Sequence, residues 1–169
     1  MLAILYGDEV RFGFSRESNY PPLDRALDAA RKAVEADPKD AAGFHSLFLT
    51  HFNRNELSAF ESAAARALAL NPNYPDMLAD YGGCKGFSGE YDIAISYLER
   101  AVELSPDPPG WYKFNIAVVR YFLKEYDTAL ATIEGVNLGA SFWGNAARAM
   151  VHGQIGNSKE ASIYMNRVL

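Results

Sequence analysis

A short phrase recurs in this chain at a fixed interval. The segments KAVEADP, RALALNP and RAVELSP end at Pro38, Pro72 and Pro106, so successive prolines are 34 residues apart (72 − 38 and 106 − 72). Proline lacks an N–H donor and biases the residue before it away from helical geometry, so each phrase predicts the end of a helix. The same helix ending at a constant spacing indicates a repeated structural unit.

The segments before these prolines carry apolar residues at helical spacing. In residues 93–104, Ile93, Tyr97 and Leu104 lie on one face and Glu99 falls on the other. Further helices are expected just after each proline, over residues 41–53, 75–88 and 109–124. No segment shows a competing period-two alternation. We therefore predict an all-α chain of antiparallel helix pairs, which stack because a single pair cannot bury its own apolar face.

The repeat resembles the tetratricopeptide repeat (TPR). Its third copy, MLADYGGCKGFSGEYDIAISYLERAVELSP, has Gly82, Ala94 and Ala101 where the family has small residues, and Gly89 and Tyr91 at the turn between helices. The resemblance implies an α-solenoid, a right-handed superhelix of about four to five helix pairs. It also implies a concave groove lined by the first helix of each pair, and a non-catalytic role in binding a protein or peptide.

The second copy departs from the family pattern. Phe48 and Phe60 occupy two positions that are expected to be small, while Ala64 occupies one that is usually large. We interpret this as an exchange of volume by one helical turn, and expect the helix crossing there to be shifted. The fourth copy has Ala117 and Ala129 at the first two small positions, but it has lost the closing proline.

The whole chain, residues 1–169, is predicted to form a single TPR-like domain. The expected parts are a leading helix and break (1–20), the end of a first repeat (21–38), three repeats (39–72, 73–106 and 107–141) and a terminal repeat (142–169). Both ends look cut. The stretches PPLDRALDAARKAVEADPKDA and NLGASFWGNAARAMVHGQIG are also similar to TPR segments that follow regulatory or cyclase domains in bacterial signalling proteins. That similarity implies, as one alternative, a regulatory segment of a larger protein.

Charge and apolar patterning exclude several classes of partner. The net charge is −5, whereas a general nucleic-acid binder needs a basic face and an anionic membrane surface attracts basic segments. No apolar run approaches the roughly 20 residues that span a bilayer, and the start lacks the features of a secretory signal. A cytoplasmic location is the default expectation. The single cysteine, Cys84, is expected to be a small buried hydrophobe.

No constellation of residues predicts catalysis. His45, His51 and His152 have no metal-ligand spacing, and the glycine-rich stretch YGGCKGFSGEY lacks the Lys-Ser/Thr of a phosphate loop. We expect His45 to be a solvated groove residue, and His51 and His152 to serve packing or helix ends. The sequence therefore predicts no enzyme, no metal site and no cofactor.

The family's register predicts which residues line the groove. The expected partner-binding residues are His45, Leu49, Phe52, Asn53, Phe87, Trp111, Phe114, Val118, Tyr121, Phe122, Trp143 and Met150. The basic residues with which family members clamp a C-terminal carboxylate are missing, so that ligand class is rejected. An apolar and aromatic groove suits an amphipathic helix or an extended apolar peptide. The alternative is that Phe114, Phe122 and Trp143 form core between adjacent helix pairs.

A rival function is structural self-association. Ile163, Met165 and Val168 near one end, with Leu2, Ile4 and Leu5 near the other, leave apolar surface that a second copy could cover, producing a homo-oligomer.

Overall fold

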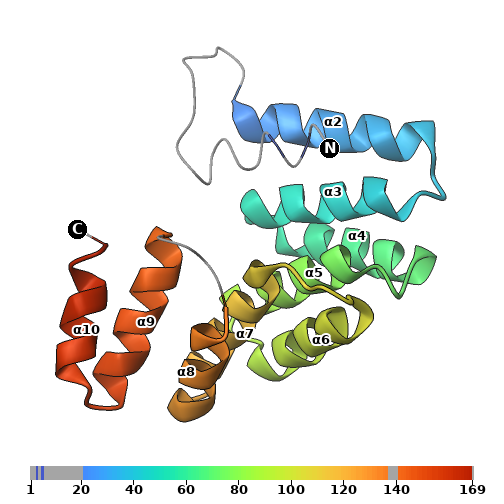
Figure 1. Cartoon of the computed structure of the whole chain (residues 1–169). Coiled ribbons are helices and arrows are strands. Elements are labelled where there is room, and N and C mark those ends of the chain that lie inside the picture. The colour runs from blue at the N-terminus through green and yellow to red at the C-terminus, as the bar shows by residue number, and fades with distance from the viewer. Residues whose placement is uncertain (1–2, 4, 6–20, 137–140, 169) are drawn as a thin grey trace. The chain divides into compact units, whose positions relative to one another are not determined.

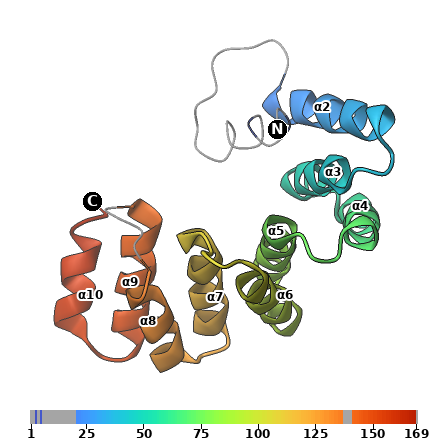
Figure 2. The same ribbon diagram turned by 45° about the vertical axis from the view of Figure 1, so that its right-hand side comes forward.

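The computed structural model describes residues 3, 5, 21–136 and 141–168 of the chain. Within these ranges the regular secondary structure is entirely helical, which confirms the predicted all-α class. The chain divides into two compact units, residues 1–77 and 78–169. Figures 1 and 2 show that the two helices of each pair run antiparallel. Most of the predicted leading segment, 1–20, lies outside the described residues.

The first unit contains α2 (Pro22–Ala36), α3 (Ala41–Asn53) and α4 (Leu57–Leu70), and α5 (Pro75–Phe87) begins in it. The helix ends follow the sequence closely. Asp37 has an extended backbone (φ −144°, ψ 96°), as its place before a proline requires. Asp40 caps the next helix, since its carboxylate accepts a hydrogen bond of 3.0 Å from the N–H of Ala42.

The second unit contains the rest of α5 and the five helices that follow it. These are α6 (Tyr91–Leu104), α7 (Gly110–Phe122), α8 (Tyr126–Glu134), α9 (Phe142–Gln154) and α10 (Ser158–Met165). In both views α7 lies between α5 and α9, which places the first helices of three successive pairs in one layer. The helices predicted over 41–53, 75–88 and 109–124 agree with the structure to within two residues at either end.

The same type of backbone turn joins the two helices of every described pair from α3 to α10. It contains a residue with positive φ at Asn55 (59°), Gly89 (83°), Lys124 (65°) and Gly156 (84°). The residue after each of these donates its N–H to the carbonyl five residues before it, at distances of 2.9 to 3.0 Å. This is the geometry that satisfies free carbonyls at a helix end. The sequence predicted the turn at Gly89 and not the equivalent turns at Asn55 and Lys124.

A side-chain contact also spans each of these turns, and the residue types that make it differ from one helix pair to the next. A basic residue in the last turn of the first helix contacts the residue that follows the positive-φ position. The contacts are His51 Nδ1 to Glu56 Oε2 (2.6 Å), Lys85 Nζ to Glu90 Oε1 (2.8 Å), Arg120 to Glu125 (3.5 Å) and His152 to Asn157 (3.5 Å). The prediction that His51 and His152 serve packing or helix ends is therefore confirmed.

In the first unit this interaction is part of a larger ionic network. The Arg54 guanidinium donates to Asp24 on α2, and its Nε donates to Glu56 Oε1 at 2.7 Å. These hydrogen bonds, that to Glu56 first, raise the pKa of Arg54 above its ordinary value. The hydrogen bond from Arg54, and secondarily that from His51, lowers the pKa of Glu56 below its ordinary value of 4.5. The network joins α2 to the turn that follows α3.

Small residues let the helices of the second unit approach closely. A Cβ atom built on Gly82 would lie 2.8 Å from Leu98 Cγ and 2.9 Å from the backbone oxygen of Ala94, on α6. Ala94 and Ala101 are fully buried, and Cys84 is buried as predicted. The contact explains why glycine stands at this position.

The predicted exchange of volume in the second copy is present in the core of the first unit. Phe48 and Phe60 are both buried, with ring centroids 5.8 Å apart in an edge-to-face arrangement. Ala64, at the usually large position, is fully buried as well. Two large rings thus fill the space between α3 and α4 where other copies have small residues.

The fourth copy closes differently because it lacks its proline. Helix α8 has 9 residues, whereas α6 has 14. Arg148 on α9 donates to the carbonyls of Ile133 and Val136, both at 3.0 Å, and so binds carbonyls at the C-terminal end of α8. A side chain from the next helix pair thus adds hydrogen bonds to the carbonyls at this helix end.

We expect Gly82→Ala to lower the free energy of unfolding by about 1–3 kcal/mol, because the added methyl group clashes with α6 backbone that cannot move aside. Urea unfolding followed by circular dichroism measures the loss. Gly153→Ala is the matched control, since a Cβ there meets nothing within 4 Å. It should leave stability unchanged or raise it by up to about 1 kcal/mol. Equal effects of the two substitutions would contradict the packing argument.

We expect the Glu56→Gln variant to differ from the wild type in a pH-dependent way. Because folding lowers the pKa of Glu56, its carboxylate stabilises the fold above pH 4.5, and this stabilisation is lost as the pH falls through the depressed pKa. The difference in unfolding free energy between the two proteins should therefore shrink below pH 4.5. Urea unfolding at a series of pH values tests this, with Glu35→Gln, at an exposed position on α2, controlling for loss of one charge. A difference that is constant with pH would contradict the role given to the ionised carboxylate.

Candidate functional site

A hollow opens between α5 and α7 in the second unit. It has a volume of about 140 Å³ and is lined by Gly83, Gly86, Phe87, Tyr91, Asn115, Val118, Val119 and Phe122. Sites for drug-sized ligands usually have about 300–1,000 Å³. The hollow, called the α5–α7 pocket below, is therefore of a size for one large side chain of a partner rather than for a small-molecule substrate.

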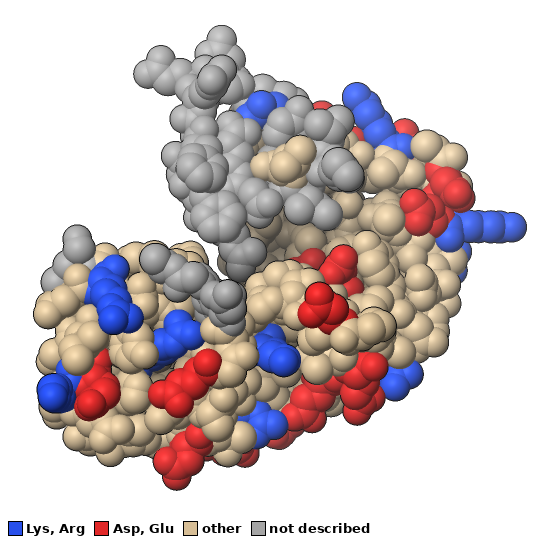
Figure 3. Space-filling model, in the orientation of Figure 1, with Lys and Arg blue, Asp and Glu red and all other residues tan. Residues whose placement is uncertain are grey.

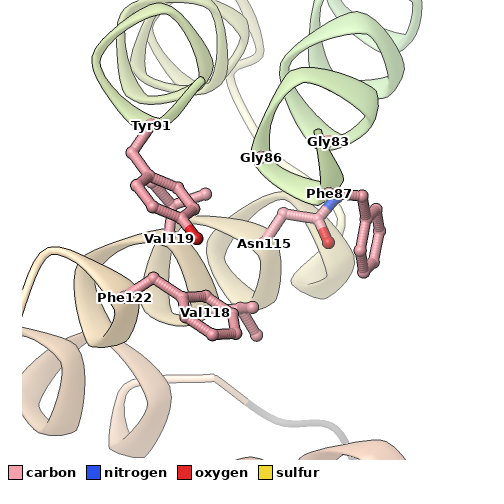
Figure 4. Close-up of a pocket in the computed structure, with 8 residues that line it drawn as sticks. All are labelled: Gly83, Gly86, Phe87, Tyr91, Asn115, Val118, Val119 and Phe122. Carbon is pink, nitrogen blue, oxygen red and sulfur yellow. The ribbon is translucent and has the colours of Figure 1, made fainter. Parts of the chain in front are cut away.

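Glycines leave the α5 side of the pocket without side chains. A Cβ atom on Gly83 would lie 3.0 Å from Asn115 Nδ2, and one on Gly86 would lie 2.9 Å from Val119 Cγ2. Because Gly83 and Gly86 have no side chains, α5 can pack closely against α7. For the same reason no side chain of these two residues fills the hollow between the helices. Figure 4 shows the Tyr91 and Phe122 rings on one side of the hollow, with Asn115 and Phe87 on the other.

Aromatic side chains at helix ends form the walls of the pocket. The rings of Tyr91 and Phe122 are stacked, with centroids 5.5 Å apart and planes only 3° from parallel. Phe122 is 48% exposed and Phe87 is 64% exposed. Both side chains keep much of their apolar surface in water, which a partner could remove from solvent. The structure thus identifies Phe122 as an exposed residue rather than core.

The apolar surface continues from α7 onto α9. Gln154 on α9 donates a hydrogen bond of 3.3 Å to the hydroxyl of Tyr121 on α7, so this face of α9 meets the pocket side of α7. Met150 lies one turn before Gln154, and Trp143 lies two turns before Met150, on the same face of the helix. Trp143 is 57% exposed and Met150 is 44% exposed. We call Phe87, Phe122, Trp143 and Met150 the inner-face anchors.

Other predicted groove residues of the second unit are less accessible. Trp111, Val118 and Tyr121 are half-buried, and Val118 lines the pocket. Phe114 is half-buried and packs against a core cluster of Ala117, Ile133 and Ala147, which leaves little of it for a partner. The core alternative is therefore favoured for Phe114.

In the first unit, one prediction is wrong. His45 is buried, not solvated, and its ring lies 5.1 Å from that of Phe48 and 5.7 Å from that of Tyr74. The reason is the bulk of Phe48 and Tyr74, which surround a position that smaller neighbours would leave open.

The remaining predicted residues of that unit differ in exposure. Leu49 and Phe52 are half-buried and Asn53 is exposed. Phe52 contacts Phe60, with ring centroids 5.4 Å apart.

Five pocket residues are absent from the list of expected partner-binding residues: Gly83, Gly86, Tyr91, Asn115 and Val119. Tyr91 matched the turn between helices, and Val119 directly follows the predicted Val118. Tyr91 is the first residue of α6, so its side chain reaches the pocket from the second helix of a pair. A register that considers only first helices does not find it.

The described residues offer no obvious centre for metal chemistry or membrane insertion. Across residues 21–136 and 141–168, no three His, Cys, Asp or Glu side chains gather in a way that could hold a metal ion. Among the helices of the described ranges, none is long and apolar enough to cross a bilayer. On the face drawn in Figure 3, described acidic and basic side chains are interspersed.

One helix pair matches a known sequence family. The tetratricopeptide repeat model matches residues 75–108, a range that holds α5 and α6. This range is the third copy, whose residues carry the predicted resemblance. The chain therefore contains a tetratricopeptide repeat at the helix pair that supplies half of the pocket.

Solved structures share the fold at low sequence identity. PilW, described as a widely conserved type IV pilus biogenesis factor, is 14% identical with a TM-score of 0.81, over 98% of this chain and 74% of that one. PilF of Pseudomonas aeruginosa is 20% identical with a TM-score of 0.77, over 99% and 73%. MamA is 18% identical with a TM-score of 0.69, over 96% and 91%. These likenesses confirm the predicted TPR-like solenoid class.

Curated relatives match a shorter part of the chain. The human protein O-mannosyl-transferase TMTC1 is 38% identical over 99 residues, which is 56% of this chain and 11% of that protein. The mouse protein of the same name is 39% identical over 88 residues, or 49% and 9%. The chain thus spans about a tenth of the length of these relatives.

Proposed function

We propose that this chain is a non-catalytic scaffold that binds a segment of another protein on the inner-face anchors of its second unit. The observation that carries the proposal is the α5–α7 pocket, flanked by Phe87 and Phe122, which are 64% and 48% exposed. Buried aromatic anchors supply much of the energy of protein interfaces, and a pocket for one side chain is where such an anchor docks.

The matched repeat and the solved neighbours agree with this role. TPR-like folds present an ordered array of helices, so a partner meets a surface that needs little reordering on binding. PilW is described as a pilus biogenesis factor, and this supports a non-enzymatic role by analogy of fold. The transferase name of TMTC1 belongs to a protein of which this chain matches about a tenth. A cytoplasmic location and a regulatory role in a signalling protein stay predictions.

We expect selection of short linear peptides from a random displayed library to enrich sequences that bind the wild-type chain. Phe122→Ala should weaken those peptides by about tenfold or more, because it removes one wall of the pocket. Fluorescence anisotropy with labelled peptides measures the change.

Ile93→Ala is the matched control, since Ile93 is 41% exposed on α6 and lies outside the pocket lining. It should leave affinity unchanged. Thermal unfolding of both variants confirms that they are folded. Equal binding to the wild type and Phe122→Ala, or no enrichment at all, would count against the proposed function.

Self-association is a second candidate, which the terminal helix favours. None of the residues of α10 is buried, and Ile163 and Met165 are 43% and 47% exposed. Exposed apolar side chains on one helix leave surface that association can remove from water. A second copy of the chain could cover it.

This candidate predicts a mass that rises with concentration in light scattering. An Ile163→Glu, Met165→Glu double substitution should then yield a monomer, because it places two charges where apolar contact is needed. Ile93→Glu is the control for adding a charge at an exposed apolar position elsewhere. A wild-type chain that is monomeric at every concentration rules the candidate out.

A further inference from the structure

We infer that the partner segment is an amphipathic α-helix with a basic polar face, and not an extended strand. The inference rests on the proposed function and names the partner of the same site. It follows from three properties of the inner face of α5, α7 and α9: its hydrogen-bonding capacity, its spacing and its charge.

The inner face has few groups that could satisfy an extended backbone. Its polar side chains are Asn115, Tyr91, Tyr121 and Gln154, with the indole N–H groups of Trp111 and Trp143, and Gln154 already donates to Tyr121. Asn115 is half-buried and makes no hydrogen bond to any described residue. An extended peptide crossing three helices would cover about 20 Å, or roughly six residues with a dozen N–H and C=O groups. These few side chains cannot satisfy a dozen backbone N–H and C=O groups.

A helix does not carry this cost. Its N–H and C=O groups bond to one another, so only side chains need partners at the surface. Leaving a backbone N–H or C=O group buried without a hydrogen bond is unfavourable, and a few such groups would abolish binding. The apolar walls of the pocket accordingly favour a ligand that brings its own backbone hydrogen bonds.

The spacing of the anchors matches a helical ligand. Packed helices lie about 8–10 Å apart, so the pocket at Phe122 and the apolar surface at Met150 are separated by about one such step. A ligand helix rises about 1.5 Å per residue, so it bridges this step in about seven residues. Residues i and i+7 fall on the same face of a helix, together with i+3 and i+4. One apolar stripe can therefore reach both places.

Charge indicates the character of the ligand's other face. None of the predicted groove residues on α5, α7 and α9 is a lysine or an arginine. The whole chain has a net charge of −5. A ligand with lysine or arginine beside its apolar stripe approaches such a surface favourably, whereas an acidic ligand is repelled.

Two displayed peptide libraries of about 18 residues, or five helical turns, test the inference. The first has a helix-forming host with random apolar residues at i, i+3, i+4 and i+7, and a random choice of Lys, Gln or Glu elsewhere. The second has the same anchor positions, but prolines at non-anchor positions prevent it from forming a helix. The wild-type chain is the target, and the Phe122→Ala and Ile93→Ala variants are the counter-targets.

We expect binders from the helical library to outnumber those from the proline library by at least about tenfold, with lysine enriched over glutamate. Their helical circular dichroism signal should rise on mixing with the chain, and Phe122→Ala but not Ile93→Ala should abolish the enrichment. Equal enrichment from both libraries, enrichment from neither, or an excess of glutamate would overturn the inference. If random linear peptides still bind in a Phe122-dependent way, the proposed function survives that result; if they also fail, both fall.

Discussion

The turn that closes each helix pair is the constraint on which the rest of the structure depends. A residue with positive φ reverses the chain, and the next N–H returns to a carbonyl five residues earlier. This bond fixes the two helices antiparallel and sets which face of each meets the other. Histidine, lysine and arginine all serve as the basic member of the accompanying side-chain contact. The geometry is therefore held by the backbone, while the side-chain chemistry varies.

Within this frame, α5 owes its position to the lack of side chains on two of its faces. Gly82 lets it approach α6, and Gly86 lets it approach α7. A helix that packs closely on two sides has little bulk to fill the space between its neighbours. The hollow at Gly83 and Gly86 is a consequence of this close packing. Aromatic residues at the helix ends, Tyr91 and Phe122, then enclose it.

The fold could be predicted from the sequence because its signals are local and recur. The prolines, the small residues and the two turn glycines each act on the chain nearby, and the helix bounds follow from them. The exposure of an aromatic residue is not local. Phe114 and Phe122 lie two turns apart on α7, yet Phe114 packs on a core formed with α8 and α9, and Phe122 is exposed. Their difference depends on the volume of residues elsewhere in the chain, as does the burial of His45.

The repeat separates residues that hold the array from those that give it an individual surface. The position two residues before each positive-φ residue is Asn53, Phe87, Phe122 and Gln154 in successive copies. Only the third and fourth copies place an aromatic ring there, and these rings flank the pocket. The equivalent amides keep the other copies polar at the same place. A shared fold with PilW or MamA therefore says nothing of a shared ligand, since the specificity of this chain resides in positions that the repeat leaves free to vary.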